Sequence, residues 1–282
     1  GTVGALLAGR GRRLIMRVPG DYAWEMHQQK PGVTPESLDT FVHCRHRGST
    51  RMLETIERWT AKHAERVVTP SAYLKNIVSV WGVVASKIRV VYSAVPPLPS
   101  GLSREEVRAN VGWNACTVLF TAVRAVPWKG VDFLLSLLED LPETYVLCVA
   151  GDGPLLPEWR HLAHDKGLDA RVRFLGRVDR EVMAGWYRAA DLFLLASGYE
   201  GFPHVVVEAV STGLPCLVSD RGGNPEAQAV FPSSVQVCPY QDHSAWKTAC
   251  LEPHPRLPPA VMDQFSAGAH QVMQLIDDLC VS

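Results

Sequence analysis

The stretch LFLLASGYEGFPHVVVEAVSTGLPCLVSD, residues 192–220, decides the fold. It reads as an apolar strand, a loop with glycines, a helix, a tight turn and a second apolar strand. Continuous runs of Val and Leu, rather than strict alternation, are typical of strands covered on both faces in a parallel sheet. Two carboxylates flank the predicted helix start, Glu200 in the loop and Glu208 in the helix.

The same alternation of strand and helix continues outward from residue 115 to residue 238. It predicts an α/β domain with a doubly wound parallel sheet. The expected strands are residues 117–124, 145–151, 172–176, 192–197, 215–220 and 234–238. The expected helices are residues 131–141, 157–167, 180–190 and 204–213.

The first part of the chain has fewer strands. The expected ones are residues 12–18, 66–70 and 87–92, with a long polar, helix-prone segment at 36–65. A helix over residues 71–82 is expected to be capped by Ser71 and to end at Gly82. Three strands are few for a Rossmann-like domain, so we expect that the chain begins inside a domain whose front is missing.

A length of 282 residues favours two domains, since single cores stop growing at about 250–300 residues. The proline-rich SAVPPLPSG (93–101) predicts the linker between them. We expect a partial N-terminal Rossmann-like domain at 1–95 and a C-terminal one at 96–262. Residues 263–282 are expected to form a closing helix that returns to the first domain.

Composition excludes several classes of function. Lys and Arg total 28 against 29 Asp and Glu, so no strong field favours nucleic acid or an anionic membrane. No apolar run approaches the roughly 20 residues of a membrane span. Seven cysteines, an odd number scattered partly in apolar strands, indicate a reducing compartment, hence the cytoplasm.

One short cluster offers metal-ligand residue types. In HCRHRG, His43, Cys44 and His46 lie together, but no second ligand pair follows at zinc spacing. We therefore expect a solvated polar face there and no metal site.

The helix start near residue 204 is predicted to bind an anion. Pro203 suits the first helical turn, and the N–H groups of Phe202, His204 and Val205 then have no partner within the helix. This end of the helix lies at the carboxyl edge of the sheet, where ligands of open α/β sheets bind. Glu200 and Glu208 could accept hydrogen bonds from sugar or ribose hydroxyls. Either one alone is better explained as a surface charge, but both beside one anion-binding helix start favour a ligand site.

A second motif, VRAVPWKG (123–130), places Arg124 and Lys129 around a turn at the same edge. A diphosphate would suit this pair, because Arg offers a fork and Lys a movable charge. Two surface cations beside a loop are the alternative.

Two further loops contain glycines. In VAGDGPL (149–155), Gly151 and Gly153 would let the backbone approach a ligand, or simply turn the chain, and the third glycine of the dinucleotide fingerprint is absent. SDRGGNPE (219–226) could open a short helix or merely turn the chain.

Taken together, these stretches resemble the retaining nucleotide-sugar glycosyltransferases of family four (glycosyl transferases group 1), which have the GT-B fold. The resemblance covers residues 66 to about 280. It rests on VRAVPWKG, VAGDGP, FLGRVDREVMAGWYRAADLFLLAS, EGFPHVVVEA and RGGNPE, in that order, with Glu200 and Glu208 forming the E-x7-E pattern of the family.

The resemblance implies a role for each matched residue. Arg124 and Lys129 would neutralise the donor diphosphate near Gly151 and Gly153, and the turn at Arg177–Val178 would lie along the base. The N–H groups after Gly201, those of Phe202 and His204 on either side of Pro203, would contact the sugar or phosphate. Glu200 would face the sugar hydroxyls, and Glu208 would take the ribose hydroxyls.

The family usually carries a histidine at the sugar-transfer centre in its N-terminal domain. The comparable stretch here, RVPGDYAWE (17–25), has Asp21 instead, which could serve there or be explained by turn chemistry.

The expected function is transfer of a hexosyl unit from a nucleotide-sugar to a carbohydrate or lipid-linked acceptor, with retention and without a metal or other cofactor. The alternatives are a non-catalytic nucleotide-sugar-binding module and, less favoured, a GT-B-fold epimerase acting on a nucleotide-sugar. No nucleic acid partner is expected, and attachment to the inner face of the membrane stays open.

Overall fold

The computed structural model describes residues 14–92 and 95–258. The described chain forms two compact units. The first contains the described residues up to Tyr92 together with the short segment Tyr199–Phe202, and the second contains Val95–Gly198 and the chain from Pro203 on. The predicted closing helix at 263–282 lies outside the described residues.

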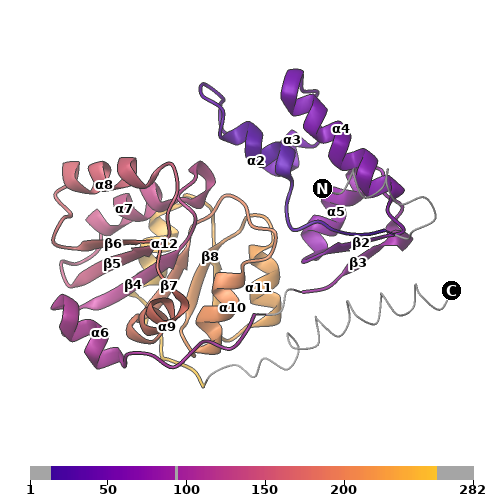
Figure 1. Cartoon of the computed structure of the whole chain (residues 1–282). Coiled ribbons are helices and arrows are strands. Elements are labelled where there is room, and N and C mark those ends of the chain that lie inside the picture. The colour runs from indigo at the N-terminus through magenta and orange to yellow at the C-terminus, as the bar shows by residue number, and fades with distance from the viewer. Residues whose placement is uncertain (1–13, 93–94, 259–282) are drawn as a thin grey trace. The chain divides into compact units, whose positions relative to one another are not determined.

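In its described residues the first unit has a parallel sheet with the strand order β1-β2-β3 (Figure 1). All three expected strands are confirmed, each at a shorter length. Ser71 caps the expected helix, because its side chain accepts a hydrogen bond from the backbone of Leu74 at 3.0 Å. The elements of this unit are β1 (Ile15–Arg17), α2 (Tyr22–Gln28), α3 (Leu38–Phe41), α4 (Gly48–His63), β2 (Arg66–Thr69), α5 (Ala72–Val80), η1 (Ala85–Lys87) and β3 (Ile88–Val90).

Helix α2 differs from the sequence-based expectation, which placed only a turn there. The helix has seven residues, too few to show a clear helical period. Its first turn is held by Asp21, whose Oδ1 accepts from Trp24 N at 2.8 Å, and by Glu57 of α4, whose carboxyl oxygens accept from Tyr22 N and Ala23 N at 2.9 and 3.0 Å. A residue 34 positions away thus satisfies orphan amides that the local sequence cannot.

The Glu57 carboxyl makes the stability of the first unit depend on pH. Burial first, and the charge of Asp21 second, raise the pKa of Glu57 from 4.5 to about 8. The folded state therefore holds this proton more tightly than the unfolded chain does. The stabilisation of the folded state by the protonated Glu57 carboxyl is complete below pH 4.5 and is lost as the pH rises to about 8. We expect the free energy of unfolding to fall by about 3–4 kcal/mol between pH 5 and pH 8 through this group.

Urea denaturation of the wild type and of Glu57→Gln at several pH values measures this effect. The difference between the two curves isolates Glu57, because every other titrating group is common to both proteins. Parallel pH profiles would show that Glu57 does not titrate in this window.

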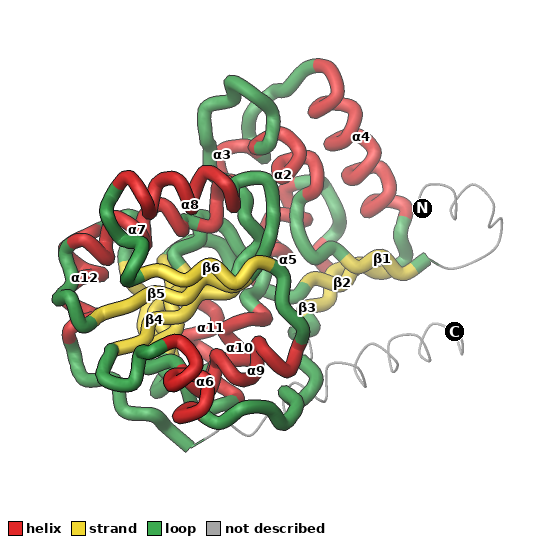
Figure 2. The backbone as a smooth tube through the Cα atoms, turned by 60° about the vertical axis from the view of Figure 1, so that its left-hand side comes forward, coloured by secondary structure: helices red, strands yellow, loops and turns green. Residues whose placement is uncertain are grey.

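The second unit has a parallel sheet in the order β6-β5-β4-β7-β8-β9. Numbered from β4, this is the 3-2-1-4-5-6 order of a Rossmann fold. Figure 2 shows α7, α8 and α12 on one face of the sheet and α6, α9, α10 and α11 on the other. The elements are α6 (Arg104–Val111), β4 (Thr117–Ala122), η2 (Pro127–Lys129), α7 (Val131–Glu139), β5 (Tyr145–Ala150), α8 (Leu156–Asp165), β6 (Val172–Gly176), α9 (Arg180–Ala189), β7 (Leu192–Leu195), α10 (His204–Ser211), β8 (Cys216–Ser219), α11 (Asn224–Val230), β9 (Val235–Cys238) and α12 (His243–Leu251).

All six strands and four helices expected here are confirmed, with differences at their ends. Strand β4 ends at Ala122, so Arg124 lies in the loop and not at the strand end. Pro203 is the N-cap of α10 and not part of its first turn. The alternative of a short helix in SDRGGNPE is correct, since α11 begins at Asn224, whose buried side chain donates to Ser219 Oγ at 2.9 Å.

The expected linker is held against the second unit. Arg180 Nη2 of α9 donates to the carbonyl oxygen of Pro96 at 3.0 Å, and Arg188 Nη1 donates to that of Pro99 at 3.2 Å. No helix within residues 14–92 and 95–258 combines the length and apolarity that a membrane crossing requires.

Candidate functional site

A cavity of about 500 Å³ opens at the carboxyl ends of strands β4, β5 and β6. We call it the β4–β6 cavity. In open parallel sheets this edge is where ligands bind. The cavity is lined by Ala122, Val123, Arg124, Ala150, Gly151, Asp152, Gly153, Arg177, Met183 and Val205.

Backbone hydrogen bonds hold the loops of this cavity in register. Ala125 N donates to the carbonyl oxygen of Asp152 at 2.9 Å, and Leu155 N donates back to that of Ala125 at 3.1 Å. Gly151 N donates to the carbonyl oxygen of Gly176 at 2.8 Å. The loops after all three strands are therefore fixed to one another before any ligand arrives.

Tertiary contacts that could not be predicted from the sequence require glycine at both positions of VAGDGPL. Gly151 has φ +117°, and a Cβ there would lie 1.9 Å from the carbonyl oxygen of Val123. Gly153 has φ +153°, and a Cβ there would lie 2.6 Å from the carbonyl oxygen of Ala125. Because the two glycines have no side chain, the loop after β4 can pass close to their backbone. They also line the cavity, as the predicted ligand contact requires.

Two arginines, Arg124 and Arg177, line the cavity. Both side chains are exposed and form no ion pair with any residue of the described ranges. The nearby carboxylate of Asp152 accepts a hydrogen bond from Gly153 N at 2.8 Å. Two exposed forks beside glycine-rich backbone are suited to bind a phosphorylated ligand.

Lys129 lies at the end of η2, in the same loop as Arg124, but does not line the cavity. The loop is fixed to the end of β7, because Gly198 N donates to the carbonyl oxygen of Trp128 at 2.7 Å. Gly130, with φ +66°, allows this approach, since a Cβ there would lie 2.3 Å from the carbonyl oxygen of Ala196. The half-buried Lys129 is thus carried by a rigid turn.

Glu208 is held within the second unit by two neighbours. Its Oε2 accepts a hydrogen bond from the Tyr187 hydroxyl at 2.9 Å, and its Oε1 lies 3.6 Å from Arg180 Nη1. Burial first, and the Glu208 charge second, raise the pKa of Tyr187 far above its ordinary value, so the hydroxyl stays protonated as the donor. Helix α10 also contributes Val205 to the cavity, whereas Glu208 and the exposed His204 do not line it.

Four of the predicted site residues belong to the first unit: Asp21, Glu200, Gly201 and Phe202. A Cβ at Gly201 would lie 2.3 Å from the carbonyl oxygen of Pro19, so a larger residue does not fit without rearrangement. Asp21 is buried and serves as the N-cap of α2, which is the turn-chemistry explanation. The predicted roles of all four residues at a bound sugar remain predictions.

The β4–β6 cavity thus brings together Arg124, Gly151, Gly153 and Arg177, four of the predicted site residues. Val178 follows Arg177 but does not line the cavity. Val205, whose backbone N–H was predicted to lie at the anion site, also lines the cavity. Sequence reasoning did not select Ala122, Val123, Ala150, Asp152 and Met183. Asp152 is charged and lies between two selected glycines, so its position in the G-D-G turn was a usable signal, whereas the apolar residues resemble any strand end.

Comparison with curated proteins places these features in a known context. An uncharacterized glycosyltransferase of Methanocaldococcus jannaschii is 27% identical over 208 residues, covering 70% of this chain and 53% of the relative. A D-inositol 3-phosphate glycosyltransferase of Xylanimonas cellulosilytica is 35% identical over 162 residues, covering 53% of this chain and 39% of the relative. The matched part of this chain therefore spans about half or less of the length of these relatives.

Among solved structures, HepE from Anabaena in complex with UDP and glucose has a TM-score of 0.73 at 18% identity. The match covers 100% of this chain and 74% of that one. This likeness confirms the expected fold class, an α/β protein of GT-B type with Rossmann-like domains. The family described as "Glycosyl transferases group 1" matches residues 103–242, which include the whole β4–β6 cavity. Residues 103–242 therefore match the glycosyl transferases group 1 family.

Proposed function

We propose that the protein transfers a hexosyl unit from a nucleotide-sugar to a carbohydrate or lipid-linked acceptor, with retention of configuration. The observation that carries the proposal is the β4–β6 cavity, where Arg124 and Arg177 face an opening edged by the glycine-rich β5–α8 turn. Two further findings support it. Residues 103–242 match a glycosyltransferase family, and HepE from Anabaena, which shares the fold, was solved with UDP and glucose.

In the proposed reaction the bond between the anomeric carbon and the diphosphate oxygen breaks, and a bond to an acceptor oxygen forms on the same face. The acceptor hydroxyl passes its proton to the departing diphosphate oxygen as the new bond forms. Negative charge gathers on the leaving phosphate oxygens, and Arg124 and Lys129 stabilise it electrostatically. Glu200 is proposed to hold the sugar hydroxyls and Arg177 to lie along the base.

We also propose that these cations replace a metal ion at the diphosphate. Addition of Mg²⁺ or Mn²⁺ to otherwise identical assays is then expected to leave the turnover unchanged. A rise in turnover that saturates with either ion would contradict the metal-independent mechanism.

A panel of radiolabelled nucleotide-sugars, incubated with and without acceptors, tests the function itself. Release of the nucleoside diphosphate with transfer of label is expected for one donor, and NMR of the product should show the donor's anomeric configuration. Binding of a donor without transfer or hydrolysis would instead favour a binding module. Conversion of the donor sugar without acceptor would favour an epimerase.

Glu208 is expected to contribute to nucleotide binding through the ribose hydroxyls. Glu208→Gln should weaken the affinity for the nucleoside diphosphate by roughly 10–100-fold, as hydrogen bonds to a charged group are worth about 1.5–3 kcal/mol. Isothermal titration calorimetry measures the change.

Tyr187→Phe is the matched control for this experiment. It removes the hydrogen bond to Glu208 but keeps the carboxylate, so nucleotide affinity should change little. Equal affinity in the wild type and Glu208→Gln would remove Glu208 from the nucleotide site.

A further inference from the structure

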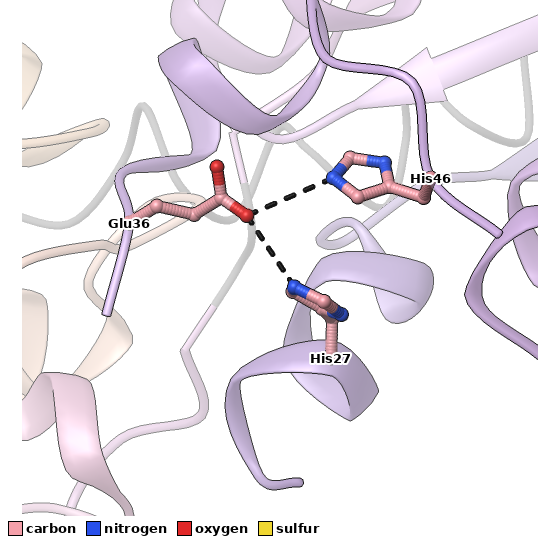
Figure 3. A group of neighbouring side chains, drawn as sticks. All are labelled: His27, Glu36 and His46. Carbon is pink, nitrogen blue, oxygen red and sulfur yellow. Dashed lines mark ion pairs between the residues drawn. The ribbon is translucent and has the colours of Figure 1, made fainter. Parts of the chain in front are cut away.

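Three side chains that are distant in sequence converge in the first unit, and none of them has a role in the proposed transfer reaction. His27 comes from α2, Glu36 precedes α3, and His46 precedes α4. Figure 3 shows the Glu36 carboxylate between the two imidazoles. The facing ligand atoms of all three residues lie within 4.8 Å of one another.

The expectation of a solvated polar face holds for only part of the HCRHRG segment. His43 and Cys44 are exposed, as predicted. The prediction is wrong for His46, whose side chain is only 10% exposed. Its ring stacks on the buried Phe41 at 4.0 Å between ring centres, so packing turns His46 inward toward Glu36.

We propose that His27, Glu36 and His46 bind a transition-metal ion of the zinc class. Two imidazole nitrogens and a carboxylate oxygen form a recurrent three-residue ligand set of zinc, with water in the fourth position. In a tetrahedral site with zinc bonds of 2.0–2.2 Å, ligand atoms are about 3.3 Å apart. Glu36 Oε1 lies 3.4 Å from His27 Nε2 and 3.7 Å from His46 Nε2, close to that spacing.

A metal-bound histidine usually donates a hydrogen bond from the ring nitrogen that does not bind the metal, and both histidines have a partner for that nitrogen. His27 Nδ1 lies within hydrogen-bond distance of Thr50 Oγ1, at 3.1 Å, and Thr50 is buried. Lys30 Nζ donates to the same hydroxyl at 2.6 Å, which leaves its second lone pair to accept from His27. The proton of His27 then sits on Nδ1 and Nε2 is free to bind a metal.

His46 has a corresponding partner in Glu54. Its Nδ1 lies 3.3 Å from Glu54 Oε1, and the Glu54 side chain is only 2% exposed. His46 Nδ1 and Glu54 Oε2 are both buried without a hydrogen-bond partner among the described residues. A metal on Nε2 would place the ring proton on Nδ1, where the Glu54 carboxylate is its acceptor. The ion would thereby give the buried His46 Nδ1 an acceptor in Glu54 Oε1, which also accepts from Arg58 Nη2 at 3.0 Å.

The proposed ion joins the three helices through their ends. Its ligands lie at the end of α2 and just before α3 and α4, so binding fixes the connection between residues 28 and 48. This role is structural, concerns only the first unit, and is separate from the proposed chemistry of the β4–β6 cavity.

Metal binding can be measured directly on the full chain, prepared without a histidine tag and stripped with a chelator. Calorimetry with Zn²⁺ is expected to give one ion per chain, and excess Mg²⁺ should not compete, because it prefers all-oxygen sites. His27→Gln and His46→Gln should each lower the Zn²⁺ affinity by at least roughly 100-fold. Glu54→Gln, which alters only an outer contact, should lower it by about 10–100-fold.

His43→Gln and Cys44→Ser are the matched controls. They remove exposed ligand types from the same segment as His46, so both should bind Zn²⁺ like the wild type. Loss of binding in these two variants but not in His46→Gln would show adventitious binding at the exposed segment and overturn the proposal. Absence of Zn²⁺ binding to the folded wild type would overturn it as well.

A second readout covers variants that fail to fold. Zn²⁺ should raise the melting temperature of the wild type, because a ligand of the folded state stabilises it. Co²⁺ bound to the wild type should show tetrahedral visible bands without thiolate charge transfer, whereas a thiolate band would assign the ion to cysteine and contradict the proposal. Neither measurement uses donor or acceptor, so failure of the proposed transfer reaction would leave this test unaffected.

Discussion

Arg124→Ala and Lys129→Ala are each expected to lower turnover by roughly 10²–10³-fold, as removal of an electrostatic stabiliser does. The reason is the charge that develops on the leaving diphosphate. Arg124 borders the β4–β6 cavity without an ion-pair partner in the described chain, so its guanidinium is available to a phosphate. Lys129 is carried by the rigid turn that follows.

Donor hydrolysis and transfer of label both report turnover, and calorimetry reports affinity for the nucleoside diphosphate. Arg160→Ala is the matched control, since it removes an exposed arginine of the same unit that does not line the cavity. Arg124→Lys keeps the positive charge but loses the paired N–H donors of the guanidinium group. Its turnover should lie between that of the wild type and that of the alanine variant. Unchanged kinetics in both alanine variants would show that Arg124 and Lys129 do not bind the diphosphate.

Gly151→Ala is expected to destabilise the second unit by about 3 kcal/mol or more. Two effects add. The backbone at φ +117° is strained for any residue with a Cβ, and that Cβ would lie 1.9 Å from the carbonyl oxygen of Val123. Relief requires separation of the loops after β4 and β5, which carry Arg124 and the glycine turn.

Gly167→Ala separates strain from collision. Gly167 also has a positive φ, +67°, but no atom lies within 4 Å of a Cβ built there. This variant should lose only about 1–2 kcal/mol, the cost of the left-handed conformation itself. Urea denaturation measures the free energy of unfolding of both variants. Equal losses would show that the contact with Val123 does not contribute to the destabilisation.

The candidate site was predicted in part. Arg124, Gly151, Gly153 and Arg177 were selected from the sequence, and they do line one cavity. Their common position follows from local order, because each comes after a strand of a parallel sheet and carboxyl ends meet at one edge. The contact of Gly151 with Val123 could not be predicted, because no sequence pattern says which backbone passes beside a glycine.

The first unit shows the limit of local reasoning more clearly. Helix α2 was missed because its start depends on Glu57, which lies on α4. His46 was expected in solvent because no second ligand pair follows it at zinc spacing, yet its ring packs on Phe41 and lies beside Glu36. Both errors have the same cause: the deciding partner lies in another element.

The sequence by itself determined the six expected strands of the second unit, the helices α7, α8, α9 and α10, the cap of α5 at Ser71 and the parallel character of the sheet, but not α6 or α12. These features depend on residue periodicity and on neighbours within about one turn, which a single stretch of chain contains. Only the tertiary structure decided the strand order, the partners of Glu208 and the meeting of His27 with Glu36 and His46. Such contacts join groups from different elements, and packing of the whole unit selects them.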